Sequence, residues 1–183
     1  MADPGFFPFP EINTPRLCLR NIALTDASEL FFLRSDDRVM QFIGREKMKT
    51  IEEVELFIQH IFERYNKNET LMWAITLNED PVKLIGTINF WRILKDHYRA
   101  ELGYVLNPSH WNKGIMKEAI SAVVDYGFGP MQLHSIEARI NPDNVASAKV
   151  LENSGFIREA YFKEDFFFKG NFFNTAVYSL VNG

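Results

Sequence analysis

A short glycine-containing segment in the middle of the chain has the residue types of an anion-binding turn. It consists of Trp111, Asn112, Lys113, Gly114, Ile115 and Met116. An amphipathic pattern follows, so we expect the turn to open a helix, where free amides and about half a positive charge attract anions. Gly114 allows a tight turn without a Cβ in the way, and Lys113 and Lys117 add positive charge. An ordinary loop before an amphipathic helix is the alternative interpretation of this motif alone.

Hydrophobic periodicity predicts the elements that must position this turn. We expect strands at residues 16–20, 71–77, 82–91, 99–106, 135–140, 156–168 and 172–181, and helices beginning near Thr25, Thr50, Lys113 and Asn144. Gly127 and the Gly129–Pro130 pair should stop the helix that begins near Lys113. This order predicts one α/β domain, residues 14–183, with a mostly antiparallel central sheet flanked by helices and a strand–helix–strand crossover in its middle. Residues 1–13 hold prolines and a glycine among aromatics, which predicts a loose N-terminal arm.

Charge and hydropathy exclude several classes of protein. The net charge is −4 and the isoelectric point is near 5.6, which disfavours a general nucleic-acid-binding surface. No apolar run approaches the roughly 20 residues of a membrane span, and the first residues lack the basic start of a secretory signal. We therefore expect a cytoplasmic protein that uses neither a membrane nor direct nucleic-acid contact.

Cysteine and histidine usage argues against metal chemistry. Cys18 is the only cysteine and lies in an apolar run, which is typical of a buried, inert thiol in a reducing compartment. The four histidines are scattered, and neither a C-x-x-C nor an H-E-x-x-H pattern occurs. We expect no metal site.

Four ordered blocks resemble one enzyme family. The blocks are residues 14–20 (TPRLCLR), 101–119 (ELGYVLNPSHWNKGIMKEA), 141–147 (NPDNVAS) and 151–156 (LENSGF). They resemble the Gcn5-related N-acetyltransferase (GNAT) superfamily, and more closely its RimJ/RimL-type branch. The resemblance covers roughly residues 14–180. It implies a sheet that splays apart between two central strands, and acetyl-CoA as co-substrate.

The resemblance also implies where acetyl-CoA binds. The pantetheine arm would pair with the backbone of Tyr104, Val105 and Leu106 as an added strand does, and the pyrophosphate would sit on amides of residues 112–116, beside Trp111. Asn141 and Asn144 would also bind the cofactor, with Asn144 hydrogen-bonding the arm where the sheet opens after Ile140.

Two positions depart from the superfamily turn. Met116 is bulkier than the usual small residue, and Asn112 replaces a frequent glycine. Neither change removes a backbone donor, and asparagine tolerates left-handed geometry better than most residues.

Glu101 and Ser147 are the candidate catalytic residues. In the resembling branch a matching glutamate activates the amine through water, and a serine hydrogen-bonds the cofactor sulfur. The tyrosine that protonates the thiolate in many superfamily members is replaced here by Leu151. Glu101 has an alternative structural role as an ion-pair partner of Arg99 or Arg139, and Ser147 as a group that closes the first turn of its helix. Backbone amides near Val105 would meet the developing oxyanion.

Three functions follow from the resemblance. The first is acetylation of the N-terminal α-amine of a protein or peptide, such as a ribosomal protein. The second is acetylation of a small amine such as a polyamine, amino acid or antibiotic. The third is a CoA-binding sensor without catalysis. The phenylalanines at 162, 166–168, 172 and 173 are explained best by core packing, with an acceptor groove or a dimer contact as alternatives. Both a monomer and a homodimer fit the sequence.

Overall fold

The computed structural model describes residues 6–183 as an eight-stranded sheet covered by helices on both faces. The order across the sheet is β1-β2-β3-β4-β5-β6-β8-β7, and every neighbouring pair is antiparallel except β5 and β6. The strands are β1 (Ile12–Asn13), β2 (Leu17–Asn21), β3 (Leu71–Leu77), β4 (Gly86–Leu94), β5 (Arg99–Leu106), β6 (Ser135–Ile140), β7 (Ile157–Phe168) and β8 (Asn171–Val181). This is the mostly antiparallel α/β architecture that the sequence predicts.

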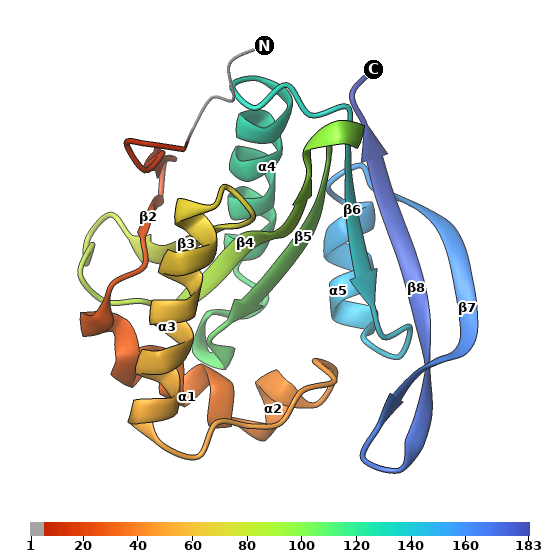
Figure 1. The fold of residues 1–183 in the computed structure, drawn as a ribbon, viewed down its shortest axis with the longest axis horizontal. Coiled ribbons are helices and arrows are strands. Elements are labelled where there is room, and N and C mark those ends of the chain that lie inside the picture. Colours follow the sequence, from red (N-terminus) through yellow and green to blue (C-terminus); the bar gives the residue numbers. More distant parts are fainter. Residues whose placement is uncertain (1–5) are drawn as a thin grey trace.

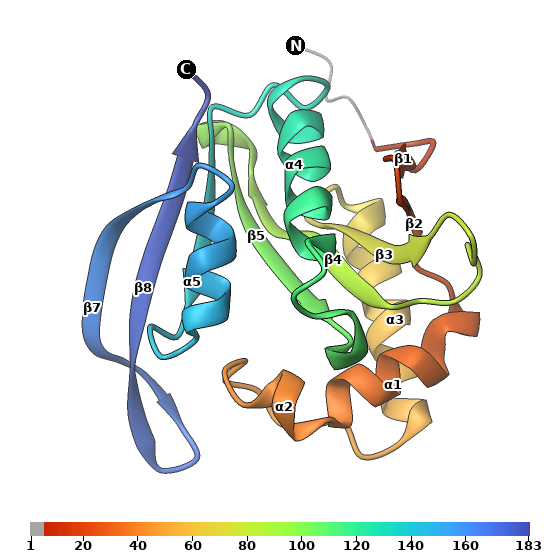
Figure 2. The same ribbon diagram turned by 180° about the vertical axis from the view of Figure 1, so that it is seen from behind.

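Helices from the two halves of the chain cover opposite faces of the sheet. Figure 1 shows α3 in front of the sheet with α1 and α2 below it, and Figure 2, from behind, shows α4 and α5. Their bounds are α1 (Ala27–Ser35), α2 (Asp37–Met40), α3 (Ile51–Asn66), α4 (Ile115–Phe128) and α5 (Val145–Glu152). Among residues 6–183, no helix is both long and apolar enough to cross a membrane.

Each face has its own hydrophobic core because the central strands are buried on both sides. Ile115, Ala119 and Val123 of α4 pack on one face, around the fully buried Trp73. Val54 and Ile58 of α3 pack on the other face. The helical spacing of these apolar residues is the reason that each helix lies flat on the sheet.

The sheet splays open between β5 and β6. These parallel strands are paired only over Arg99–Glu101 and Ser135–Glu137. Beyond that point β6 continues alongside β8, and within the described chain no strand pairs with residues 102–106 on the side facing β6. The separation of β5 from β6 is visible in Figure 1. It leaves backbone donors and acceptors of β5 available to an extended ligand.

Several expected boundaries shift for local reasons. The helix expected from Lys113 begins at Ile115, because Gly114 is its left-handed N-cap. It also passes through Gly127 and ends at Phe128, since Gly127 packs closely on Phe90 and Ile136 and has a packing role instead of stopping the helix. The strand expected from residue 82 begins at Gly86.

The described part of the N-terminal arm is not loose. The Tyr65 hydroxyl donates a 2.6 Å hydrogen bond to the carbonyl of Phe6, and Trp73 Nε1 donates one of 2.6 Å to the carbonyl of Pro10. Phe9 packs edge-on against Trp73. Residues 6–13 are therefore held against the core by aromatic side chains, and residues 1–5 lie outside the described part.

Candidate active site

Side-chain alternation along β5 sends the candidate residues to opposite faces of the sheet. Tyr104 packs on the core beneath α4, whereas Val105 belongs to the core beneath α1 and α3. Because side chains alternate along a strand, Glu101 and Gly103 share the face of Val105. The opening between β5 and β6 is thus approached from two sides, with a different set of side chains on each.

The turn that precedes α4 is shaped as an anion-binding turn requires. Gly114 has φ +72° and Asn112 has φ +58°, both in the left-handed region. Trp111 Nε1 donates a 2.9 Å hydrogen bond to the carbonyl of Leu106, which ties the turn to the end of β5. The turn at residues 111–116 therefore lies directly beyond the strand expected to hold the pantetheine arm.

The first turn of α4 has two apolar residues in the core and a lysine in solvent. Ile115 and Met116 are buried in the core, so the bulk of Met116 does not obstruct the turn. Lys113 and Lys117 are exposed. The first four amides of a helix have no partner within it, and here they are flanked by two ammonium groups. This donor set fits a pyrophosphate group.

Hydrogen bonds from the β1–β2 connection hold this turn in place, and the sequence did not indicate them. Glu118 in the first turn of α4 accepts hydrogen bonds from Thr14 Oγ1 (2.6 Å), Arg16 Nε (2.6 Å) and the Arg16 amide (3.0 Å). Arg16 Nη1 also donates to the carbonyl of Lys113 at 2.9 Å. Burial alone would raise the pKa of Glu118, but the hydrogen bonds from Thr14 and Arg16 outweigh it and lower that pKa.

Tyr104 and Ser147 meet on the α5 side of the opening. The Tyr104 phenolic oxygen lies 2.7 Å from Ser147 Oγ, and Ser147 is buried. Burial raises the pKa of the Tyr104 phenol, so it stays protonated at neutral pH and able to donate. Sequence reasoning assigned only the Tyr104 backbone a role, because the target of its side chain depends on where α5 docks.

The asparagines expected near the cofactor arm use their side-chain oxygens locally. Asn144 Oδ1 accepts a 3.0 Å hydrogen bond from the Ser147 amide and caps α5. Asn141 Oδ1 accepts a 2.9 Å bond from the Asp143 amide. Leu151 is fully buried in the core. Ser147 Oγ, hydrogen-bonded to Tyr104, is therefore the hydroxyl group of α5 at the opening.

Glu101 lies on the other face, in a groove, and its ion-pair partner differs from those expected. Glu101 Oε2 is 3.3 Å from Arg92 Nη2, because Arg92 is its cross-strand neighbour on β4. Arg99 pairs instead with Glu137, at 2.6 Å, and Arg139 with Asp165, at 3.3 Å. Glu101 therefore has the structural ion pair that was the alternative to a catalytic role, but its partner is Arg92 and not Arg99 or Arg139, the neighbours expected to supply it.

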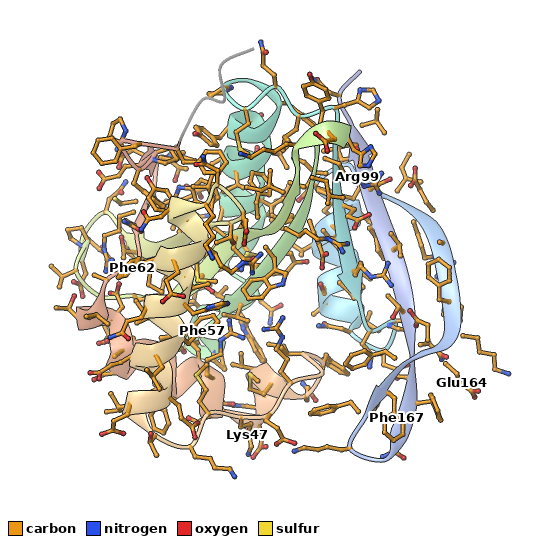
Figure 3. The ribbon with its side chains drawn as sticks, viewed as in Figure 1. Lys47, Phe57, Phe62, Arg99, Glu164 and Phe167 are labelled. Carbon is orange, nitrogen blue, oxygen red and sulfur yellow. The ribbon has the colours of Figure 1, made fainter. Side chains whose placement is uncertain are left out.

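The groove around Glu101 has a volume of about 330 Å³ and lies between the loop at residues 41–44 and the β7–β8 hairpin. Phe166, Phe168 and Phe173 line it. The exposed fractions of Phe166, Phe167 and Phe172 are 40%, 60% and 64%, so core packing does not explain the aromatic hairpin. Figure 3 shows Phe167 on this hairpin, across from Phe57 of α3.

Asn89 places an unsatisfied oxygen on the same face. Asn89 pairs with Gly103 across β4 and β5, and a Cβ on Gly103 would lie 2.6 Å from Asn89 Oδ1. This oxygen is buried and, within the described chain, has no hydrogen-bond partner. Buried polar atoms are rarely unpaired. The absence of a side chain at Gly103 leaves room for this carboxamide beside Glu101.

Known proteins are similar to this chain in sequence. The sequence profile described as the acetyltransferase (GNAT) domain matches residues 16–157. An uncharacterized N-acetyltransferase of Bacillus subtilis (strain 168), YoaA, is 38% identical over 173 residues, which cover 94% of this chain and 97% of YoaA. The [ribosomal protein uS5]-alanine N-acetyltransferase of Escherichia coli (strain K12) is 29% identical over 101 residues, 55% of this chain and 52% of that protein.

Solved structures share the fold. A GNAT-family acetyltransferase from Bacillus anthracis superimposes with a TM-score of 0.83 at 29% identity, covering 94% of this chain and 98% of its own. The spermidine N-acetyltransferase of Vibrio cholerae, solved in complex with CoA and spermine, has a TM-score of 0.81 at 22% identity, covering 92% and 96%.

Proposed function

Because this chain belongs to the GNAT family of N-acetyltransferases, we propose that it transfers the acetyl group of acetyl-CoA to the N-terminal α-amine of a protein or peptide. The observation that carries the proposal is the opening between β5 and β6. A left-handed turn before α4 lies at one end of this opening, and different polar groups lie on its two faces. A cytoplasmic location is part of this proposal.

Acetyl-CoA would supply the acetyl group as an activated thioester. The unpaired edge of residues 102–106 would hold its extended arm, and the turn at residues 111–116 would hold its pyrophosphate through main-chain amides. Asn141 and Asn144 lie where the arm would enter, at the start of α5. The amide near Val105 is the donor that we assign to the oxyanion.

On the acceptor face, Glu101 would take a proton from the incoming amine through a water molecule. Its carboxylate lies in the groove, and Arg92 beside it holds it in place. Glu101 and that water would orient a neutral amine toward the opening.

On the other face, Ser147 would present its hydroxyl to the departing sulfur. Ser147 Oγ has Tyr104 as its near neighbour. When the Tyr104 phenol donates to Ser147 Oγ, the serine proton is left to point elsewhere, toward the opening. Tyr104 is therefore a positioning residue in this scheme, and Ser147 the donor.

The reactivity of amines favours an α-amine acceptor. An α-amine with a pKa near 7.7–8.0 is roughly a fifth neutral at about pH 7.3, whereas a lysine is under ~0.1% neutral. A carboxylate that acts through water gives modest help, which suffices for the former. The likeness to a ribosomal-protein alanine acetyltransferase supports the same choice. A small-amine acceptor is the second candidate, which the likeness to spermidine acetyltransferases favours.

An acceptor panel with the purified enzyme tests this proposal. Thiol release from acetyl-CoA is followed with a peptide that has a free N-terminus and no lysine, with the same peptide N-blocked and carrying one lysine, and with spermidine. The proposal expects turnover of the first and little of the others. Turnover of spermidine alone would establish the second candidate, and acetyl-CoA binding without any turnover would favour a non-catalytic sensor.

A further inference from the structure

Two arginines on the acceptor face have no carboxylate partner within residues 6–183. Arg34, in the last turn of α1, stacks 5.1 Å above the ring of Phe57, and its Nε is buried without a hydrogen-bond partner. Arg45, in the loop after α2, is exposed and lies 4.6 Å above the ring of Trp91. Aromatic rings therefore hold both guanidinium groups in place, and neither has a neutralising anion.

Arg34 and Arg45 differ from the neighbouring cations, because each of those has a carboxylate as an ion-pair partner. Arg45 lines a cavity of about 370 Å³ between α2 and the tip of the β7–β8 hairpin. The other three cations that line it each have a carboxylate: Arg38 with Asp36 at 2.6 Å, Lys47 with Asp37 at 2.8 Å, and Lys169 with Glu46 at 2.9 Å. A cation that is left unmatched in such a setting is available to a ligand.

Placing two like charges together has a cost that an anion would offset. Burial, and then the nearby charge of Arg45, lower the pKa of Arg34 to about 10. Arg34 nevertheless remains charged at neutral pH, so the repulsion persists in the free protein. A guanidinium group offers paired donors that match a carboxylate, and such charge-assisted hydrogen bonds are strong.

The cavity that Arg45 lines adjoins the groove that holds Glu101. The two share Gln41 and Phe168 as lining residues. One extended acceptor can therefore place its amine beside Glu101 and a more distant group beside Arg45. The chain as a whole is acidic, with net charge −4, so this local cationic pair distinguishes one end of the acceptor path from the average surface.

We propose that Arg34 and Arg45 form an anion-binding subsite for the acceptor, and that the preferred acceptor is a peptide N-terminus with carboxylate side chains in its first few residues. This inference rests on the proposed function, because it concerns the cavity that adjoins the groove of Glu101. A polyamine would bring its own positive charges to these arginines and would be disfavoured there.

Amidated hexapeptides of equal length test the proposal with the full chain and saturating acetyl-CoA. All begin with alanine, and the following positions carry two aspartates, two asparagines or two lysines. We expect kcat/KM to be about tenfold higher for the acidic than for the neutral peptide, lowest for the basic peptide, and the preference to shrink from 50 to 500 mM salt. Equal values for acidic and neutral peptides, or a preference for the basic peptide, would overturn the proposal.

Variants locate the effect. Arg45→Gln removes the exposed guanidinium and should reduce the preference for the acidic peptide to about twofold or less. Arg38→Gln is the matched control, because Arg38 lines the same cavity but is paired with Asp36, and it should keep the full preference. If Arg45→Gln keeps the full preference for the acidic peptide, or if Arg38→Gln loses it equally, Arg45 does not belong to the subsite.

Arg34→Met retains the stacking volume over Phe57 without the buried charge. The variant should lose acidic preference while its melting temperature stays equal or rises, since an uncompensated buried charge is removed. A purely structural Arg34 would give a lower melting temperature with unchanged preference, which would exclude Arg34 from the subsite.

Binding separates this inference from the proposed function. The N-acetylated acidic and neutral hexapeptides are titrated calorimetrically into the CoA-bound protein, because product binding needs no turnover. Tighter binding of the acidic product to wild type than to Arg45→Gln supports the subsite even if no peptide is turned over, in which case the proposed α-amine activity alone fails. Equal binding of acidic and neutral products overturns the subsite.

Discussion

The phenolic oxygen of Tyr104 lies 2.7 Å from the hydroxyl oxygen of Ser147, on the face of β5 opposite to Glu101. The first residue comes from a strand and the second from a helix 43 positions later. Their contact places two hydroxyl groups in series beside the opening in the sheet. A carboxylate therefore serves one face of the proposed reaction site, and a hydroxyl pair serves the other.

Tyr104→Phe should lower kcat by about two- to tenfold, the range that corresponds to one neutral hydrogen bond, with little change in the KM for acetyl-CoA. The phenol orients Ser147 and is not itself the donor. In a Ser147→Ala background, where nothing remains to orient, the same change should have almost no effect on kcat. Steady-state kinetics of the four proteins measure this coupling, and equal losses in both backgrounds would contradict it.

Glu101→Gln should lower kcat/KM for the acceptor by about 10²-fold at pH 7, because the amine loses its proton acceptor. The deficit should shrink toward pH 9, above the α-amine pKa of about 7.7–8.0, where the amine is already neutral. A pH profile of both proteins measures this. Glu137→Gln is the control, because Glu137 also contacts Arg92, at 3.7 Å, but does not line the groove; a loss as large in the control would assign Glu101 a structural role.

Glu118→Gln should destabilise the fold at pH 7 by about 1–2 kcal/mol, since charge-assisted hydrogen bonds from Thr14 and Arg16 are weakened. The lowered pKa of Glu118 means that its contribution is present above the ordinary value of 4.5 and is lost as pH falls through the folded value. The difference in melting temperature between wild type and variant should therefore be largest near neutrality and shrink below about pH 4.5. A difference in melting temperature that does not change with pH would contradict a stabilising role for the ionised Glu118 carboxylate.

Gly44→Ala should weaken acceptor binding several-fold and leave acetyl-CoA binding unchanged. A Cβ at Gly44 would lie 2.5 Å from the ring of Phe166, and its φ of +59° adds strain. The ring must then move within the groove. Phe166→Leu in the same chain should recover part of the acceptor KM, since a shorter side chain leaves room. If the effects of Gly44→Ala and Phe166→Leu on the acceptor KM are simply additive, the loop at residues 41–44 does not act through Phe166.

The mostly antiparallel sheet and its longer helices followed from periodicity and from the resemblance, because they depend on short-range spacing. The short strand β1 and the short helix α2 were not predicted. The opening beyond Leu102 was predicted by the resemblance, as was the turn at Gly114. Boundary errors arose where packing outweighed local propensity, as at Gly127, which fits between Phe90 and Ile136 inside a helix.

The parts of the site that escaped prediction depend on contacts between distant segments. Arg16 braces Glu118 across 102 positions, and Arg92 instead of Arg99 or Arg139 reaches Glu101 because of the β4–β5 register. The Tyr104 side chain and the unpartnered Asn89 oxygen likewise become meaningful only once neighbouring elements are placed. Spacing along one chain carries no signal for such pairs.

Calorimetric titration of acetyl-CoA into three proteins tests the central claim most directly. Wild type and Gly170→Asp should bind with micromolar affinity, whereas Gly114→Asp should not bind, because a carboxylate at the start of α4 repels phosphate. Gly170 is the matched control: its φ of +81° resembles the +72° of Gly114, but it lies in the β7–β8 turn with nothing within 4 Å. Failure of folded wild type to bind, or equal binding by Gly114→Asp, would contradict the assignment of this opening as the acetyl-CoA site.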